Sequence, residues 1–152
     1  MKIEIDQSGK IENTHKPTVI GFSNTKNKTI IIFATEKQKL LRYFRKIGKQ
    51  KVFIYIVFAT LICLLLKNEK NIDQIIIDKE YPGQEALIKN YLLSFFRKTG
   101  RDIDKGSISF RQIGKKSKAH QIVYQSYQHK RSDAKVTAKD VLKYFVKLKS
   151  GV

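Results

Sequence analysis

The sequence predicts an α/β protein in which a mixed sheet is flanked by helices. Three short apolar segments near the start of the chain predict an antiparallel meander, because only tight polar turns separate them. Two further apolar segments alternate with stretches of helical periodicity, an arrangement typical of a mixed sheet covered by helices. We therefore expect one domain over residues 1–152 with the order βββ-α-β-α-β-α, in which the first helical region contains two consecutive stretches.

The meander opens the chain. Its strands are expected at residues 2–6, 17–23 and 29–34. The first strand alternates polar and apolar residues, whereas the third is a near-continuous apolar run of the kind that is buried on both faces. Polar turns at residues 7–10 and 24–28 connect the three strands.

Two helical stretches follow the meander. Thr35 with Gln38 at the reciprocal position predicts a capping box at the start of the first helix. Gly48 marks a break, after which residues 52–66 are apolar except for Thr60. Because this run is shorter than the roughly 20 residues of a membrane-spanning helix, we expect a buried core helix and no stable membrane insertion.

The remaining elements alternate. They are expected as a strand at 72–78, a helix at 85–98, a strand at 107–113 and a final helix that begins at Asp133 or Thr137 and ends at Leu148. The basic segment 115–131 is expected to be a helix or an ordered loop. In the final helix, one apolar face contains Val141, Leu142, Phe145 and Leu148.

The chain is strongly basic. It contains 31 lysines and arginines against 13 acidic residues, a formal net charge of +18, which points to a polyanionic partner and most directly to nucleic acid. A hydrophobic content of 41% excludes a disordered basic tail. The charged start of the chain is no secretory signal and Cys63 is the single cysteine, so we expect a cytoplasmic protein without disulfides or a zinc cluster.

Several classes of enzyme are disfavoured. The chain has no glycine-rich phosphate loop of the nucleoside triphosphatase type, and no local signature of Ser-His-Asp or Cys-His catalysis. Cys63 lies in the apolar run and is expected to be buried and inert.

Three aspartates stand at informative positions. Asp6 lies in or ends the first strand, Asp78 ends the fourth, and Asp133 follows the basic segment. If the first and fourth strands are neighbours, Asp6 and Asp78 lie side by side and repel each other unless a cation neutralises them. Oxygen ligands favour Mg²⁺ or Mn²⁺, and two such ions ~4 Å apart activate water and stabilise the leaving oxygen of a phosphodiester. The alternative is that these aspartates are ordinary turn and cap residues.

The acidic positions and the strand order together resemble the ribonuclease H-like superfamily, which includes ribonucleases H, resolvases and transposase cores. Residues 5–9 resemble its first strand with a metal-binding aspartate, and residues 75–81 resemble its fourth strand, which ends in a second aspartate. The segment from 110 through His120 to Asp133 resembles its fifth strand, a loop with a mobile histidine and a last aspartate that opens a helix. The resemblance implies a five-stranded mixed sheet and a divalent-metal-dependent nuclease.

The resemblance also implies roles for individual residues. Asp6 and Asp78 would be shared metal ligands, Asp133 the third, and Glu36 or Glu80 the fourth, with Glu85 as a further option. Glu36 and Glu85 are equally explained by favourable placement at a helix N-terminus. His120 would protonate the leaving group or loosen the product, and His129 is a second histidine of the same segment.

Basic residues form two groups that could bind nucleic acid. The first is the polar face of the first helix, which includes Lys37, Arg42 and Arg45. The second surrounds the expected site and contains Arg111, Lys115, Lys116, Lys118, Lys130 and Arg131, with Tyr124 and Tyr127 among them as residues that could stack on bases.

Three questions stay open at the level of sequence. The substrate expected for a nuclease is RNA, an RNA–DNA hybrid, branched DNA or a single strand, and the sequence does not select among them. The alternative to a nuclease is a non-catalytic nucleic-acid-binding protein of the same fold. Resolvase-type members of the superfamily are dimers, so a homodimer is one option for the assembly.

Overall fold

The computed structural model describes residues 1–150, with side chains described for residues 1–145, and in this part of the chain six strands form one mixed sheet. The strands are β1 (Lys2–Ser8), β2 (Thr18–Ser23), β3 (Asn27–Ile32), β4 (Gln74–Asp78), β5 (Ile108–Arg111) and β6 (Ala134–Val136). The helices are α1 (Ala34–Lys46), α2 (Phe53–Leu65), α3 (Glu85–Lys98), α4 (Lys118–His129) and α5 (Ala138–Ser150), and a 3-10 turn covers Lys105–Ser107.

The strand order in the sheet is β5-β4-β1-β2-β3-β6. Strands β1, β2 and β3 form the expected antiparallel meander. Strands β4 and β5 extend the sheet from β1 in parallel, and β6 runs parallel to β3 at the other edge. In this register Asp6 lies opposite Gly21, and Gly21 lies opposite Thr29.

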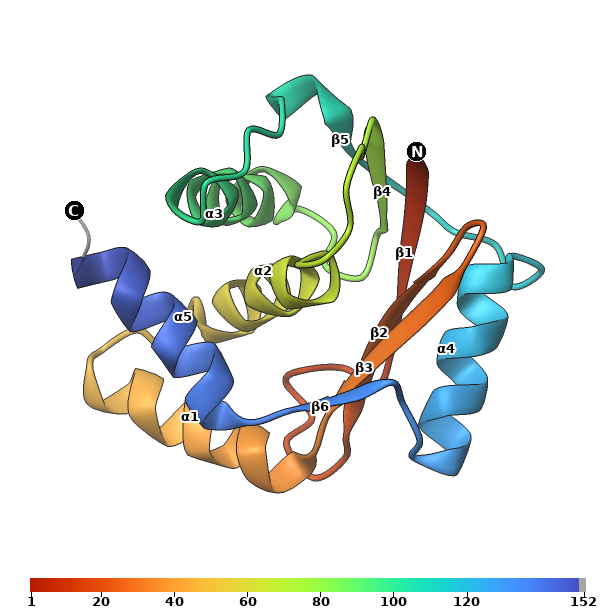
Figure 1. Cartoon of the computed structure of the whole chain (residues 1–152). Coiled ribbons are helices and arrows are strands. Elements are labelled where there is room, and N and C mark those ends of the chain that lie inside the picture. Colours follow the sequence, from red (N-terminus) through yellow and green to blue (C-terminus); the bar gives the residue numbers. More distant parts are fainter. Residues whose placement is uncertain (151–152) are drawn as a thin grey trace.

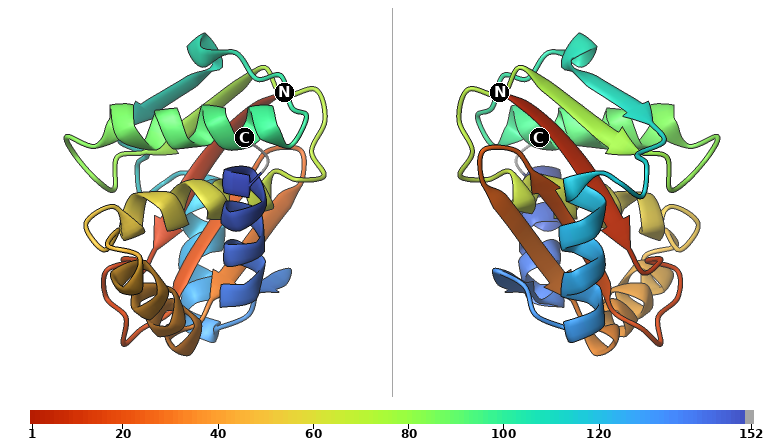
Figure 2. Two further views of the ribbon diagram at one scale, coloured as in Figure 1. Left: turned by 90° about the vertical axis from the view of Figure 1, so that its left-hand side faces the viewer. Right: turned by 90° about the vertical axis from the view of Figure 1, so that its right-hand side faces the viewer.

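Helices cover both faces of the sheet (Figures 1 and 2). Helices α1, α2, α3 and α5 lie on one face and bury the main core with the apolar side chains of β1 to β5. Helix α4 lies alone on the other face, where Val123 packs with Val19 and Ile31 in a smaller apolar cluster. The small size of this cluster leaves room for polar groups between α4 and the sheet.

Helix α2 is the apolar stretch expected to be a core helix. Most of its residues are buried, and the hydroxyl of Thr60 donates to the carbonyl of Ile56, which satisfies this buried polar side chain. Within the described residues, no helix has the length and apolar character needed to cross a membrane.

The expected elements are found with shifted ends and two corrections. The helix at Glu85–Lys98 is confirmed, and the basic segment forms helix α4. The capping box of Thr35 is wrong: α1 begins at Ala34, two residues before the start that a Thr35 cap implies, and its N-cap, Phe33, has no side-chain cap bond.

The second correction concerns the sheet, which has six strands where five were expected. Asp133 does not open a helix, because β6 follows it and pairs with β3. Helix α5 begins after Thr137, whose hydroxyl accepts from the backbone N–H of Asp140, so the alternative start at Thr137 is confirmed. The side chain of Leu148 lies outside the described residues.

Candidate metal centre

Three carboxylates converge where β1 and β4 end. Asp6 lies near the end of β1, Asp78 is the last residue of β4, and Glu80 follows two residues later. One carboxylate oxygen from each of the three lies within 4.8 Å of the others. The parallel pairing of β1 with β4 places Ile5 opposite Ile77, so the next residue of each strand is an aspartate.

The cluster is electrostatically unfavourable without a counter-charge. Asp6 is only 3% exposed, and burial together with the charge of Asp78 raises its pKa, although a backbone hydrogen bond and His120 act in the opposite direction. Burial, a hydrogen bond to Asp78 and the charges of Asp78 and Asp6 raise the pKa of Glu80 to about 8. The site therefore favours a bound proton or a cation over three free negative charges.

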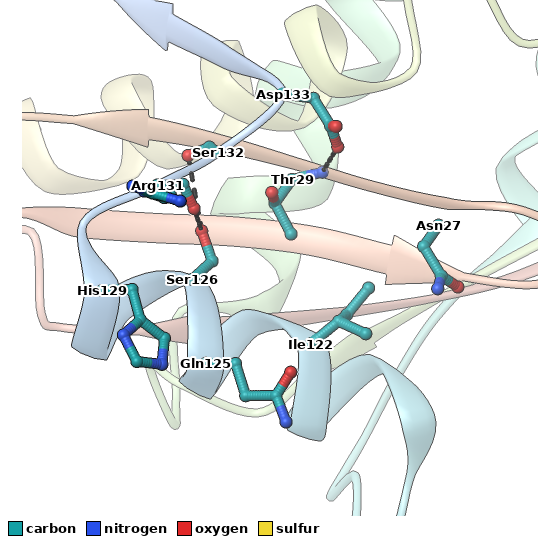
Figure 3. A pocket seen from close by; sticks show the side chains of 9 residues that line it. All are labelled: Asn27, Thr29, Ile122, Gln125, Ser126, His129, Arg131, Ser132 and Asp133. Carbon is teal, nitrogen blue, oxygen red and sulfur yellow. Dashed lines mark hydrogen bonds between the residues drawn. The ribbon is translucent and has the colours of Figure 1, made fainter.

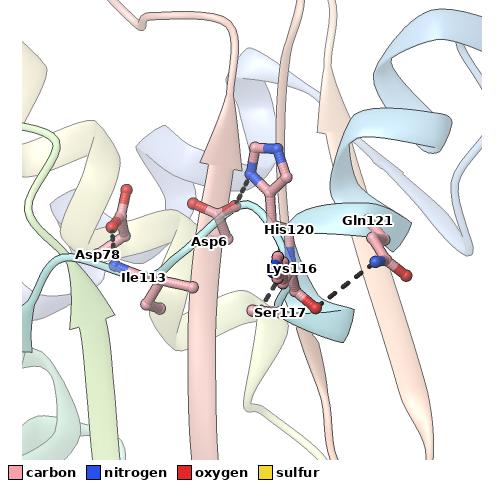
Figure 4. Close-up of polar contacts among 7 residues, drawn as sticks. All are labelled: Asp6, Asp78, Ile113, Lys116, Ser117, His120 and Gln121. Atoms are coloured by element: carbon pink, nitrogen blue, oxygen red, sulfur yellow. Dashed lines mark hydrogen bonds and ion pairs between the residues drawn. The ribbon is translucent and has the colours of Figure 1, made fainter.

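His120 completes the cluster from helix α4. Its Nδ1 lies 2.8 Å from Oδ2 of Asp6, and the Ser117 hydroxyl caps the helix by accepting from the His120 backbone N–H (Figure 4). On the other side of Asp6, the backbone N–H of Ile113 donates to Oδ1 of Asp78 at 2.6 Å. These bonds hold Oδ2 of Asp6 and Oδ1 of Asp78 in place.

Gly21 explains how α4 approaches the sheet so closely. A Cβ built there would lie 2.9 Å from Val123 of α4 and 2.7 Å from the backbone carbonyl oxygen of Lys28. Because Gly21 is the β2 partner of Asp6, the missing side chain lets the helix settle directly beside the aspartate. Sequence patterns gave no sign of this contact.

Basic residues belong to the chain segments that meet at the cluster. Arg111 is the β5 partner of Asp78, and the charge of Lys10 lowers the pKa of Glu80. Five basic side chains of these segments are exposed: Lys10, Arg111, Lys115, Lys116 and Lys118. From the sequence, Lys10 was expected to be only a turn residue. The position of Lys10 just beyond the strand of Asp6 was the signal that could have identified it.

Asp133 does not lie with the other aspartates, which corrects its expected role as the third ligand. It stands beyond β3, with β2 and β3 between it and β1, so its backbone is roughly 14 Å from that of Asp6. Its carboxylate accepts from the backbone N–H of Thr29 at 2.8 Å. There it lines a polar cavity of about 760 Å³ with His129 and Arg131 (Figure 3).

Glu36 is also outside the cluster. Its carboxylate accepts from the backbone N–H of Ala138 at 2.9 Å and pairs with Lys39 at 3.0 Å, so it joins the starts of α1 and α5. Glu85, the other alternative ligand, accepts from the backbone N–H of Gly83.

Lys37 was expected on the cationic face of α1 and is instead fully buried. Its ammonium donates to the carbonyl oxygens of Lys10 and Asn13 and to the hydroxyl of Thr18. Burial lowers its pKa to about 8. Lys37 therefore fixes the loop between β1 and β2 and is not available to nucleic acid.

The remaining predicted binding residues stay on the surface. They are Arg42 and Arg45 on α1, Tyr124 on α4, and Lys130 and Arg131 after α4. Tyr127 is half-buried against Val19, Ile31 and Val123. Cys63 is buried, as expected, and burial raises the pKa of its thiol to about 12, so it is inert as a thiolate.

Comparison of the chain with models of protein families, with curated proteins and with solved structures gave no match.

Proposed function

We propose that the protein is a divalent-metal-dependent nuclease that hydrolyses phosphodiester bonds. The observation that carries this proposal is the convergence of Asp6, Asp78 and Glu80, whose ligand oxygens lie within 4.8 Å of one another. Asp6 is buried and Asp78 and Glu80 are half-buried, so their mutual repulsion is costly, and perturbed groups of this kind are concentrated at functional sites.

The residues of the cluster fit Mg²⁺ or Mn²⁺. All three carboxylates offer oxygen ligands, which these hard ions prefer, and the raised pKa of Glu80 marks a site where positive charge is favourable. When bound, the ion would polarise a phosphoryl oxygen and lower the pKa of an attacking water. Asp6, Asp78 and Glu80 would hold it, and His120 would orient Asp6 through its 2.8 Å contact.

The arrangement of the first five strands supports the same proposal. An antiparallel meander with β4 beside β1 and β5 beyond it is the sheet that the ribonuclease H-like resemblance implies, with aspartates near the ends of β1 and β4. Strand β6 is an addition to that arrangement.

The surroundings of the cluster suit a nucleic-acid backbone. Exposed cations from three separate segments stand near the carboxylates: Lys10 after β1, Arg111 in β5, and Lys115, Lys116 and Lys118 around the start of α4. Cations spread around a site neutralise several phosphates without reading base sequence. These cations suit the phosphate backbone of any nucleic acid. The proposed substrate is RNA, an RNA–DNA hybrid or branched DNA.

One observation favours a non-catalytic nucleic-acid-binding protein as the second candidate. Two of the predicted ligands, Asp133 and Glu36, bond to backbone N–H groups elsewhere, so the cluster has fewer acidic groups than the resemblance implies. This protein would bind nucleic acid through the same cations without hydrolysing it.

Cleavage of labelled nucleic acids with Mg²⁺ tests the proposal. The panel contains single-stranded RNA, an RNA–DNA hybrid, a DNA duplex and a four-way DNA junction. We expect the wild type to cut at least one of them and Asp78→Asn to lose the activity by 100-fold or more, on the order of a lost metal ligand. Asp102→Asn, the same change at an exposed loop position, should remain active. Binding without cleavage by the wild type would support the second candidate.

A further inference from the structure

Tyr124 is an exposed aromatic residue beside the carboxylate cluster. Among the described residues, the large hydrophobic side chains that are exposed are Tyr124, at 47%, and Ile47, at 37%. Tyr124 belongs to α4, the helix that also provides His120. An exposed aromatic ring on a basic surface offers a face on which a nucleobase can stack.

The ring of Tyr124 is held in place. It stacks on the His120 ring with an interplanar angle of 9° and a centroid distance of 6.1 Å. Its hydroxyl accepts from the side-chain amide of Gln128 at 2.9 Å. Because His120 is itself bonded to Asp6, Tyr124 is connected to the carboxylate cluster through one intervening ring.

Tyr124 lies on the flank of α4 that faces the end of β1. His120, Tyr124 and Tyr127 follow each other at helical spacing, and a Cβ on Gly9 would lie 2.7 Å from the Tyr127 ring. This flank is therefore next to the turn that follows Asp6. The exposed ammonium groups of Lys10, Lys116 and Lys118 belong to the neighbouring segments, so the region is complementary to a polyanion.

We infer, on the basis of the proposed nuclease function, that Tyr124 stacks on an unpaired nucleobase of the strand whose phosphate lies at the carboxylate cluster. A base inside a duplex has both faces covered by its neighbours, whereas a single-stranded or displaced base offers a face to an aromatic ring. The structure thus assigns a substrate class: a strand that is single or locally unpaired beside the bond that is cut.

The test uses a DNA duplex with one bulged nucleotide, because the bulge fixes the register of the unpaired base. Binding is measured by fluorescence anisotropy with Ca²⁺ for the bulged duplex, for the same duplex with an abasic bulge, and for the fully paired duplex. The variants are Tyr124→Leu, Tyr124→Phe and, as a control on the opposite flank of α4, Gln125→Leu.

Wild type, Tyr124→Phe and Gln125→Leu should bind the bulged base at least about fivefold more tightly than the abasic bulge, as expected for one stacked base. Tyr124→Leu should lose this preference. Equal binding of the two bulges by the wild type, a preference that survives Tyr124→Leu, or equally tight binding of the fully paired duplex overturns the inference.

These outcomes are separable from those of the cleavage assay. If Mg²⁺-dependent cleavage is lost in Asp78→Asn but the bulge preference is absent, the stacking role of Tyr124 fails and the nuclease stands. If no substrate is cut but the preference requires Tyr124, the nuclease fails and the base contact stands.

Discussion

His120 of α4 and Asp6 of β1 lie 114 positions apart in sequence, and their Nδ1 and Oδ2 atoms are 2.8 Å apart. This contact joins the single helix on one face of the sheet to the most buried carboxylate of the cluster. It fixes one oxygen of Asp6 and so orients the other. The orientation of the Asp6 carboxylate therefore depends on how α4 is placed.

His120→Ala should weaken the binding of Mg²⁺ at the cluster, although all three carboxylates remain. We expect the Mg²⁺ concentration needed for half-maximal cleavage to rise by roughly 10- to 100-fold, the usual cost of removing a group that orients a metal ligand. The measurement is a Mg²⁺ titration of the cleavage rate. His129→Ala, an exposed change on the same helix, should leave the titration unchanged. An unaltered titration for His120→Ala would argue against the positioning role.

Asp6→Asn and Asp133→Asn test whether cleavage depends on the carboxylate cluster or on the far side of the sheet. Asp6→Asn should abolish Mg²⁺-dependent cleavage, because it removes a buried carboxylate from the group of three. Asp133→Asn should change the cleavage rate less than about threefold and lower the free energy of unfolding by less than about 1 kcal/mol, since the amide oxygen still accepts from the Thr29 N–H. Cleavage rates and urea unfolding measure both. Loss of cleavage in Asp133→Asn would contradict the placement of the site.

Glu80→Gln should stabilise the metal-free protein above pH 5. The pKa of Glu80 in the folded protein is about 8, above the ordinary value of 4.5. Between pH 4.5 and 8 the native state therefore binds more protons than the unfolded chain. The stability that Glu80 contributes in the wild type is full below pH 4.5 and is lost as the pH rises through 8. Thermal melts in chelator should give Glu80→Gln a free energy of unfolding about 1 kcal/mol higher than that of the wild type at pH 8. This difference should vanish near pH 4.

Glu85→Gln provides the control for this effect. It removes a carboxylate from the first turn of α3, where negative charge is favourable, so its melting temperature should not rise. A melting temperature of Glu80→Gln at or below that of the wild type at pH 8 would show that the cluster carries no electrostatic cost.

Lys37→Met should lower the free energy of unfolding by about 2 kcal/mol at pH 7, because three oxygen acceptors lose their donor. Lys39→Met, an exposed change on the same helix, should cost less than about 0.5 kcal/mol. The folded pKa of Lys37 is about 8 and its ordinary value is 10.5, so the unfolded chain binds more protons between these values.

The stability of the wild type relative to Lys37→Met should therefore rise as the pH increases from 8 to 10.5. Denaturant unfolding across this range measures the difference. A difference that falls with pH would mean that the buried ammonium is held by its acceptors more strongly than burial disfavours it.

Local patterns were sufficient for much of the fold and for part of the site. Helical periodicity identified α3 at Glu85–Lys98, and apolar runs identified the meander and α2. Asp6 and Asp78 could be brought together from sequence because each was expected at or near the end of a strand, and neighbouring parallel strands end at the same edge of a sheet.

The remaining features depend on contacts that no local pattern encodes. Strand β6 has three residues, too few to show alternation, and its pairing with β3 is what carries Asp133 away from Asp6. Lys37 falls on the polar face of α1, where the sequence predicts an exposed side chain. It is buried because the loop between β1 and β2 folds over it. The approach of α4 to Asp6 depends on Gly21, whose role exists only in the assembled sheet.

The most direct measurement is the anomalous scattering of crystals of the wild-type protein soaked with Mn²⁺. The account predicts a peak at about 2.0–2.4 Å from carboxylate oxygens of Asp6, Asp78 and Glu80, and its absence in Asp78→Asn crystals soaked in the same way. Wild-type crystals with no peak at this cluster, or with manganese only in the cavity of Asp133 and His129, would contradict the account.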